Sequence, residues 1–146
     1  MSRFLCVFLP ALVVALGQVH AQNAIDWGVL ADVKFEKKYS DKWAMDYDEA
    51  TFGKLPLLYA GEEVSISGYI IPIDALGLSY VLSRNPNATC FFCGGAGPET
   101  VIELRFKPEA MKRYRMDERR TFKGILQLNR ENIKQFTYVL LQAEPG

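Results

Sequence analysis

Two cysteines, Cys90 and Cys93, are the residues of this chain whose type and spacing are best suited to chemistry. They lie in the segment TCFFCGGAGPE, in which a glycine-rich stretch follows the second cysteine. Two thiols three positions apart can bind one metal ion, close a short disulfide, or cycle between thiol and disulfide. The residues leave these three interpretations open, and each implies a different function.

The first 21 residues are typical of a secretory signal peptide. Arg3 supplies the positive start, the stretch 4–16 is apolar, and Val19-His20-Ala21 has the small-x-small pattern of a cleavage site. The apolar stretch is shorter than the roughly 20 residues that a membrane-spanning helix needs. We therefore expect a mature chain of residues 22–146 that is exported and has no transmembrane segment.

Cleavage would remove Cys6 and His20, and His20 is the single histidine of the sequence. Histidine bases, Cys–His pairs and histidine-ligated metals are then excluded from the mature protein. The three cysteines become an even pair, which fits an oxidising compartment. We expect a binding or accessory protein rather than an enzyme, with no catalytic residues assigned.

The metal interpretation needs further ligands, because a Cys-x-x-Cys pair is half of a tetrahedral zinc site. The candidate metal ligands are Cys90, Cys93 and Glu99, with Glu103, water or the cysteines of a second subunit as alternatives. Zinc is the metal that such a set suggests. A metal shared between subunits would make the protein a dimer.

Redox activity and a structural disulfide are the competing interpretations. In thioredoxin-like enzymes the cysteine pair begins a helix, whereas Cys93 is followed by glycines and Pro98, which do not start one. A disulfide between Cys90 and Cys93 would close a very short loop and stabilise the fold by only about 2 kcal/mol. Phe91 and Phe92 would cover it.

The mature part is long enough for a single domain. Without Arg3, the 17 basic residues become 16 against 17 acidic ones, a net charge of −1 that gives no general attraction to nucleic acid. β-rich runs are expected at 64–71, 78–82, 100–106, 122–128 and 137–142, with a short helix opening at Pro108. Strand, strand, strand, helix, strand, strand is the order of an OB barrel, so we predict a mainly β, OB-like five-stranded barrel.

Residues 22–60 precede the barrel as an aromatic-rich N-terminal lead-in. One short half-buried strand is expected at 33–39, and the other rings are expected to pack on the domain. Asp41, Asp46, Asp48 and Glu49 are interpreted as loop surface. Eight basic residues between 105 and 123 are interpreted as a solvated helix face, and nucleic acid is not expected as a partner.

Several segments together resemble the DUF3299 family of exported bacterial proteins of unassigned function. They are the run GKLPLLYAGEEVSISGYIIP that ends at Pro72, the pair Leu82-Ser83, the segment CFFCGGAGPE from Cys90 to Glu99, and Val101-Ile102-Glu103-Leu104. The resemblance implies a bacterial protein that is periplasmic or otherwise secreted and has an OB-like β-fold. Another branch of that family carries Cys-x-His at the comparable loop, an exchange that a metal site tolerates. This implies metal binding for Cys90 and Cys93 alone, although the present chain lacks that histidine and the prolines after it.

We therefore expect a small exported binding protein, with metal handling, thiol–disulfide exchange and a disulfide-shaped interaction module as alternatives. Its partner would be a protein or a metal ion.

Overall fold

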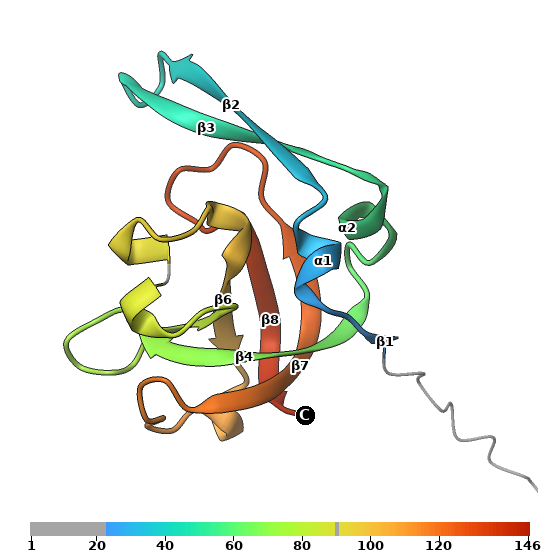
Figure 1. The fold of residues 1–146 in the computed structure, drawn as a ribbon, viewed down its shortest axis with the longest axis vertical. Helices are drawn as coiled ribbons and strands as arrows, with labels where there is room; N and C mark the ends of the chain where they lie inside the picture. Colours follow the sequence, from blue (N-terminus) through green and yellow to red (C-terminus); the bar gives the residue numbers. More distant parts are fainter. Residues whose placement is uncertain (1–22, 90) are drawn as a thin grey trace, which may run out of the picture.

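The computed structural model describes residues 23–89 and 91–146, and five of its strands close into a barrel (Figure 1). These strands are β4 (Glu63–Pro72), β5 (Tyr80–Ser83), β6 (Val101–Phe106), β7 (Arg119–Leu128) and β8 (Tyr138–Pro145). They follow one another around the barrel in the order β4, β5, β6, β8, β7, and β7 pairs back with β4. β6 and β8 are parallel, and the other pairs are antiparallel. The OB-like barrel predicted from the sequence is confirmed.

The barrel encloses a core of aliphatic side chains that alternate with outward-facing ones along each strand. On β4, for example, Ile66 and Ile70 are 1% and 0% exposed. They meet Leu82 of β5, Ile102 of β6 and Leu126 of β7, all at 0%. β-Branched and leucine side chains fit such a closed sheet, which explains why these runs were recognisable as strands.

One end of the barrel is filled by an aromatic cluster of Tyr80, Phe106, Tyr114 and Phe122. Tyr114 comes from the segment where the sequence predicts a helix opening at Pro108. The structure has a single 3-10 turn there, Pro108–Ala110, and the chain then extends. The extended course lets the Tyr114 ring stack on Phe106 with centroids 5.4 Å apart, while its hydroxyl donates to the Ala110 carbonyl. The predicted helix therefore does not continue beyond this turn, because the extended chain lets the Tyr114 ring pack into the core.

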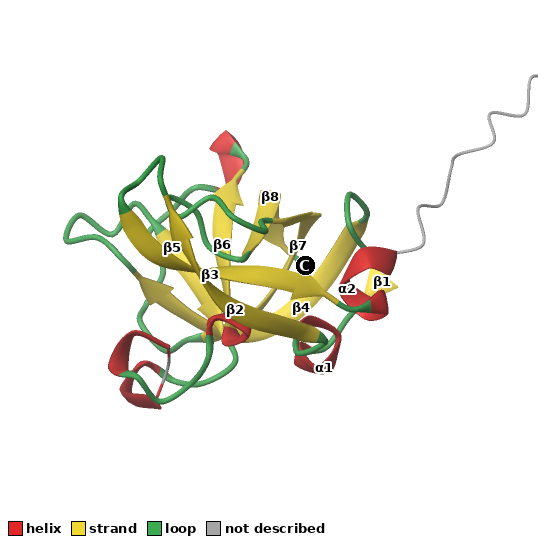
Figure 2. Ribbon diagram, turned by 90° about the horizontal axis from the view of Figure 1, so that it is seen from above, coloured by secondary structure: helices red, strands yellow, loops and turns green. Residues whose placement is uncertain are grey.

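The N-terminal lead-in is more ordered than the sequence suggests. It contains β1 (Asn23–Ala24), α1 (Trp27–Leu30), β2 (Val33–Ser40), β3 (Met45–Phe52) and α2 (Lys54–Leu58). β1 adds to β4 in parallel, and β2 and β3 pair with each other as an antiparallel hairpin outside the barrel sheet. The hairpin reaches out over one side of the barrel (Figures 1 and 2). The lead-in therefore has three strands where the sequence predicts one, at 33–39, and Asp46, Asp48 and Glu49 belong to β3 rather than to a loop.

The short helix α1 fastens the lead-in to the barrel. Asp26 caps it, with its carboxylate accepting from the amides of Gly28 and Val29. The indole nitrogen of Trp27 donates to the Ser67 carbonyl at 2.8 Å. The carbonyl of the fully buried Leu30 accepts from the Tyr138 hydroxyl at 2.7 Å.

The helices in the described part of the chain are short, and none of them could cross a lipid bilayer.

Candidate functional site

A groove of about 400 Å³ lies where three segments meet: the β2–β3 hairpin, the β7–β8 loop (129–137) and the cysteine loop (84–100). The hairpin contributes Phe35 and Asp48, the β7–β8 loop contributes Ile133 and Phe136, and the cysteine loop contributes Phe91 and Pro98. In OB folds the loop between the fourth and fifth strands is one of the two loops that flank ligands. The β7–β8 loop occupies that position here, so this groove is the candidate functional site.

The hairpin forms one wall because its inner face is held against the barrel. The register places Phe35 opposite Ala50 and Lys37 opposite Asp48, so these four residues share one face. Ala50 is buried, and its amide donates to the Arg130 carbonyl at 3.0 Å. Further along β3, the ring of Phe52 lies 5.6 Å from that of Tyr138 on β8. These contacts therefore fix the hairpin wall to the barrel.

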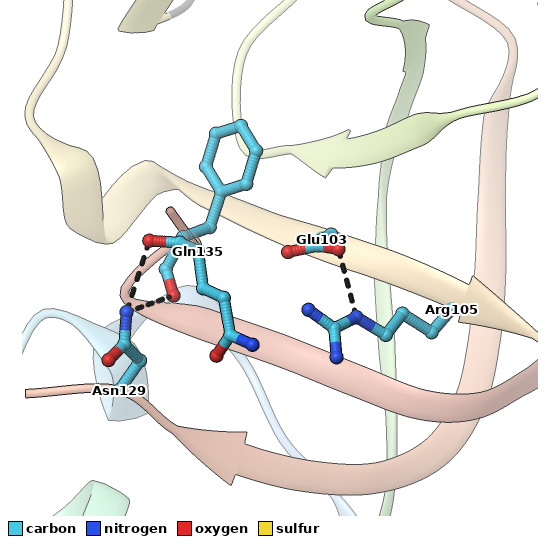
Figure 3. Close-up of polar contacts among 5 residues, drawn as sticks. Glu103, Arg105, Asn129 and Gln135 are labelled. Atoms are coloured by element: carbon cyan, nitrogen blue, oxygen red, sulfur yellow. Dashed lines mark hydrogen bonds and ion pairs between the residues drawn. The ribbon is translucent and has the colours of Figure 1, made fainter. Parts of the chain in front are cut away.

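The β7–β8 loop forms the opposite wall, and Asn129 holds its shape. Its side-chain nitrogen donates to the carbonyls of Asn132, Gln135 and Phe136 at 2.8, 3.0 and 3.2 Å. Its side-chain oxygen accepts from the Asn132 amide at 2.9 Å. Figure 3 shows the Asn129 side chain with its bonds to loop carbonyls, and it also draws the Glu103–Arg105 ion pair of β6. One side chain thus satisfies several loop groups and keeps the wall in one conformation.

Aromatic rings connect the cysteine loop to this wall. The rings of Phe91 and Phe92 lie 5.6 Å apart, and Phe92 lies 5.9 Å from Phe136. Phe92 remains 47% exposed. Phe91 lines the groove, and Phe92 reaches it through its contact with Phe136. That Phe91 and Phe92 cover the cysteine pair stays a prediction, because Cys90 lies outside the described residues.

A second hollow, of about 600 Å³, continues the groove along the hairpin tip. Both are lined by Tyr47, Glu131, Asn132 and Lys134. Two cations lie over the Trp43 ring, Lys134 at 4.7 Å and Lys42 at 5.0 Å from its centroid. The contact with Lys134 joins the hairpin tip to the β7–β8 loop.

Of the predicted metal ligands, Cys90 lies outside the described residues. Cys93 is exposed, and its thiol donates to the Asn87 carbonyl at 3.2 Å. Glu99 is half-buried in the 3-10 turn Pro98–Thr100, where its carboxylate folds over Gly97. Burial, and then the charges of Glu99 and Asp32, raise the pKa of Tyr138.

Within 23–89 and 91–146, no three carboxylate, thiol or imidazole side chains gather where they could hold one metal ion. Cys93 and Glu99 therefore do not complete a zinc site with the other described residues, and the set of Cys90, Cys93 and Glu99 stays a prediction. The groove itself was missed from the sequence. Its one signal was the pair Trp43 and Tyr47 in a highly charged stretch, where large aromatic rings suggest a surface role.

Comparison of the chain with family models, curated proteins and solved structures gives no match. The resemblance to the DUF3299 family therefore stays a prediction.

Proposed function

We propose that this chain is a small exported binding module that holds an extended segment of a partner polypeptide in the groove between the β2–β3 hairpin and the β7–β8 loop. The observation that carries the proposal is that three segments distant in sequence converge on one preformed groove. Ligand sites are typically concave, largely preformed and lined by apolar groups with a few placed polar ones.

The chemistry of the lining favours a polypeptide. Phe35, Phe91 and Phe136 offer an apolar floor for a hydrophobic side chain. Asp46 and Asp48 stand on the hairpin wall and take part in none of the ion pairs found among the described residues. Aromatic centres with polar rims are characteristic of protein interfaces. A segment with an apolar anchor next to a lysine or arginine fits this arrangement.

A library of displayed random peptides, selected on the immobilised mature chain, tests the proposal. Selected peptides should be apolar and basic, and NMR titration should move the resonances of Phe35, Asp48 and Phe136. Asp48→Lys, which reverses a charge on the inner face of the hairpin, should weaken binding about tenfold.

Glu36→Lys is the matched control, because Glu36 lies on the outer face of the same hairpin opposite Glu49. It should leave the affinity unchanged. A library without binders, or binders that do not respond to Asp48→Lys, would contradict the proposal. The same NMR titration with glycans would also overturn the proposal if sugars move the groove resonances and peptides do not.

A second candidate function is metal handling through Cys90 and Cys93. The observation that favours it is the exposure of Cys93, where a soft or borderline ion such as zinc could be exchanged with a partner. Glu99, or the cysteines of a second copy, would have to complete the ligand set.

The native mass of the protein, purified without reducing agent or chelator, tests this candidate. A metal adduct that disappears when both cysteines are changed to serine would support it, and the protein-to-metal ratio would show whether two subunits share the ion. A mass lower by about two hydrogen atoms than that of the dithiol form, without an adduct, would establish a disulfide instead. The reduction potential of that disulfide would then separate a redox protein from a structural bridge.

A further inference from the structure

One edge of β3 faces away from its partner strand β2, and we call it the outer edge. Along a strand of an antiparallel pair, the backbone groups of successive residues point alternately toward the neighbouring strand and away from it. The Gly53 amide donates across the base of the hairpin to the Asp32 carbonyl at 2.7 Å, whereas the Ala50 amide donates away from β2, to the Arg130 carbonyl. The backbone groups of Ala50 therefore lie on the outer edge.

The same alternation places the backbone groups of Asp48 and Asp46 on the outer edge. They follow from Ala50 in steps of two residues, and the pairing of β2 with β3 runs through this stretch without a register shift. Neither amide donates to a backbone carbonyl elsewhere in the described chain. At Ala50 the β7–β8 loop supplies the carbonyl that a neighbouring strand would supply, whereas no described carbonyl does so at Asp48 or Asp46.

The candidate groove runs along this edge and not over one face of the hairpin. Side chains of successive strand residues point to opposite faces, so a groove over one face would be lined by every second residue. Four successive residues of β3 line the groove instead: Met45, Asp46, Tyr47 and Asp48. The backbone groups of the outer edge therefore face the space between β3 and the β7–β8 loop.

The groove suits a single short strand. Its walls contact each other at both ends, through the Ala50–Arg130 bond and through the Trp43–Lys134 contact. A second copy of the chain would bring a hairpin of two paired strands, for which these contacts leave no width. Pairing of β3 with the same edge of another copy would also set aspartate against aspartate, which is unfavourable.

The negative charge of the groove lies along the β3 edge. Asp46 and Asp48 are exposed, share one face of the hairpin and take part in none of the ion pairs of the described chain. Lys37 lies opposite Asp48 on β2 and forms no ion pair with it. The opposite wall has one acidic and two basic residues that line the groove: Glu131, Arg130 and Lys134.

We infer that the groove binds its partner by β-strand addition: an extended segment pairs antiparallel with the outer edge of β3 and exchanges main-chain hydrogen bonds with Asp46 and Asp48. Antiparallel pairing is the more stable per residue, and in this mode the main chain supplies affinity while alternate side chains supply specificity. The two residues opposite the aspartates share their face, so they are lysine or arginine, and the residue between them is apolar and lies beside Tyr47. This inference deepens the function proposed for the groove and rests on it.

Amide hydrogen exchange, followed by NMR in the presence of the peptide acetyl-Thr-Lys-Val-Lys-Thr-amide, tests the inference. At saturating peptide the amides of Asp46 and Asp48 should exchange about tenfold more slowly, because they become hydrogen-bonded in the complex. The amides of Lys37 and Tyr39 are the matched control, since the register pairs them with the same two aspartates while their backbone groups point to the opposite edge of the hairpin. Their exchange should not change.

Methylation of the peptide backbone separates main-chain pairing from the attraction between side chains. N-methylation of both lysines removes the two amide donors that face β3 and should weaken binding about tenfold. N-methylation of the valine is the matched control, because its amide points away from β3, and the affinity should stay unchanged. Equal losses for the two methylated peptides would overturn the inference.

Failure of this inference and failure of the proposed function give different results. If peptides selected from the displayed library bind the groove without slowing the exchange of the Asp46 and Asp48 amides, the inference is overturned and the groove remains a peptide site. If no peptide binds, both are overturned. Protection of these amides in the free protein that grows with protein concentration would also overturn the inference, because a second copy would then pair with β3.

Discussion

The amide of Ala50, in the middle of β3, donates to the carbonyl of Arg130 in the β7–β8 loop at 3.0 Å. This bond links the hairpin, which pairs with no barrel strand, to the loop between the last two strands. It sets the distance between the two walls of the groove, while the Trp43–Lys134 contact joins the walls at the hairpin tip. Two small contacts therefore join the walls of the candidate site, and the one at the hairpin tip can be tested by substitution.

Lys134→Met should loosen the hairpin tip. The change keeps the aliphatic stem but removes the cation over the Trp43 ring, a contact that contributes about 0.5–1 kcal/mol at an exposed site. Acrylamide should then quench tryptophan fluorescence more strongly. Lys42→Met is the control, because Lys42 lies on the hairpin itself and its loss separates nothing. Equal quenching in the two variants would show that the tip is not held by Lys134.

Tyr138→Phe should destabilise the protein by about 1–2 kcal/mol, because it leaves the buried carbonyl of Leu30 without its donor. Urea unfolding with an unchanged m-value would measure the loss. Tyr59→Phe serves as the control, since the Tyr59 ring packs on the core while its hydroxyl makes no hydrogen bond to any of the described residues. A loss of similar size in both variants would contradict the role assigned to the Leu30 bond.

Gly68→Ala should destabilise the barrel by about 1–3 kcal/mol. A β-carbon at this position would lie 2.6 Å from the Ser83 carbonyl oxygen and 2.9 Å from side-chain atoms of Leu82 and Trp27. The backbone of β5 cannot move away without breaking the pairing of Tyr69 with Ser83. Thermal unfolding of the variant is the measurement, and a midpoint equal to that of the unchanged protein would show that the strand can shift. β4 passes Gly68 without a register shift, so this glycine marks a close approach rather than a bulge.

The stability of the folded β4–β5 loop (73–79) should depend on pH through Asp74. Hydrogen bonds from the Leu78 amide and then from Ser79 hold the pKa of Asp74 below its ordinary value of 3.8. A carboxyl group with a lowered pKa stabilises the folded loop above that ordinary value, and the stabilisation is lost as the pH falls through the lowered pKa. The amide resonances of Leu76, Leu78 and Ser79 should therefore titrate together below pH 3.8.

Asp74→Asn provides the control for that titration, because the amide side chain can accept a hydrogen bond but does not ionise. The three amide resonances should lose the titration in this variant. A midpoint at or above the ordinary value in the unchanged chain would contradict the lowered pKa.

Much of the barrel could be predicted from the sequence, because strands that bury one face alternate in a way that is visible locally. Ile66 and Ile70 on β4, and Val101 to Leu104 at the start of β6, carry that pattern, and the order of the elements then indicates an OB-like barrel. The cysteine loop was also evident, because two cysteines three positions apart need no tertiary context to be noticed.

The hairpin and the groove were decided only by tertiary structure. The stretch 45–52 is rich in aspartate and glutamate and has weak intrinsic strand preference. It becomes β3 because β2 lies alongside it and because Ala50 and Phe52 contact the barrel. At Pro108 the sequence predicts a helix, but the chain extends after one turn so that Tyr114 can close the barrel end. Sequence patterns record which residues are buried within one element, whereas the groove arises from contacts between residues that are far apart in the chain.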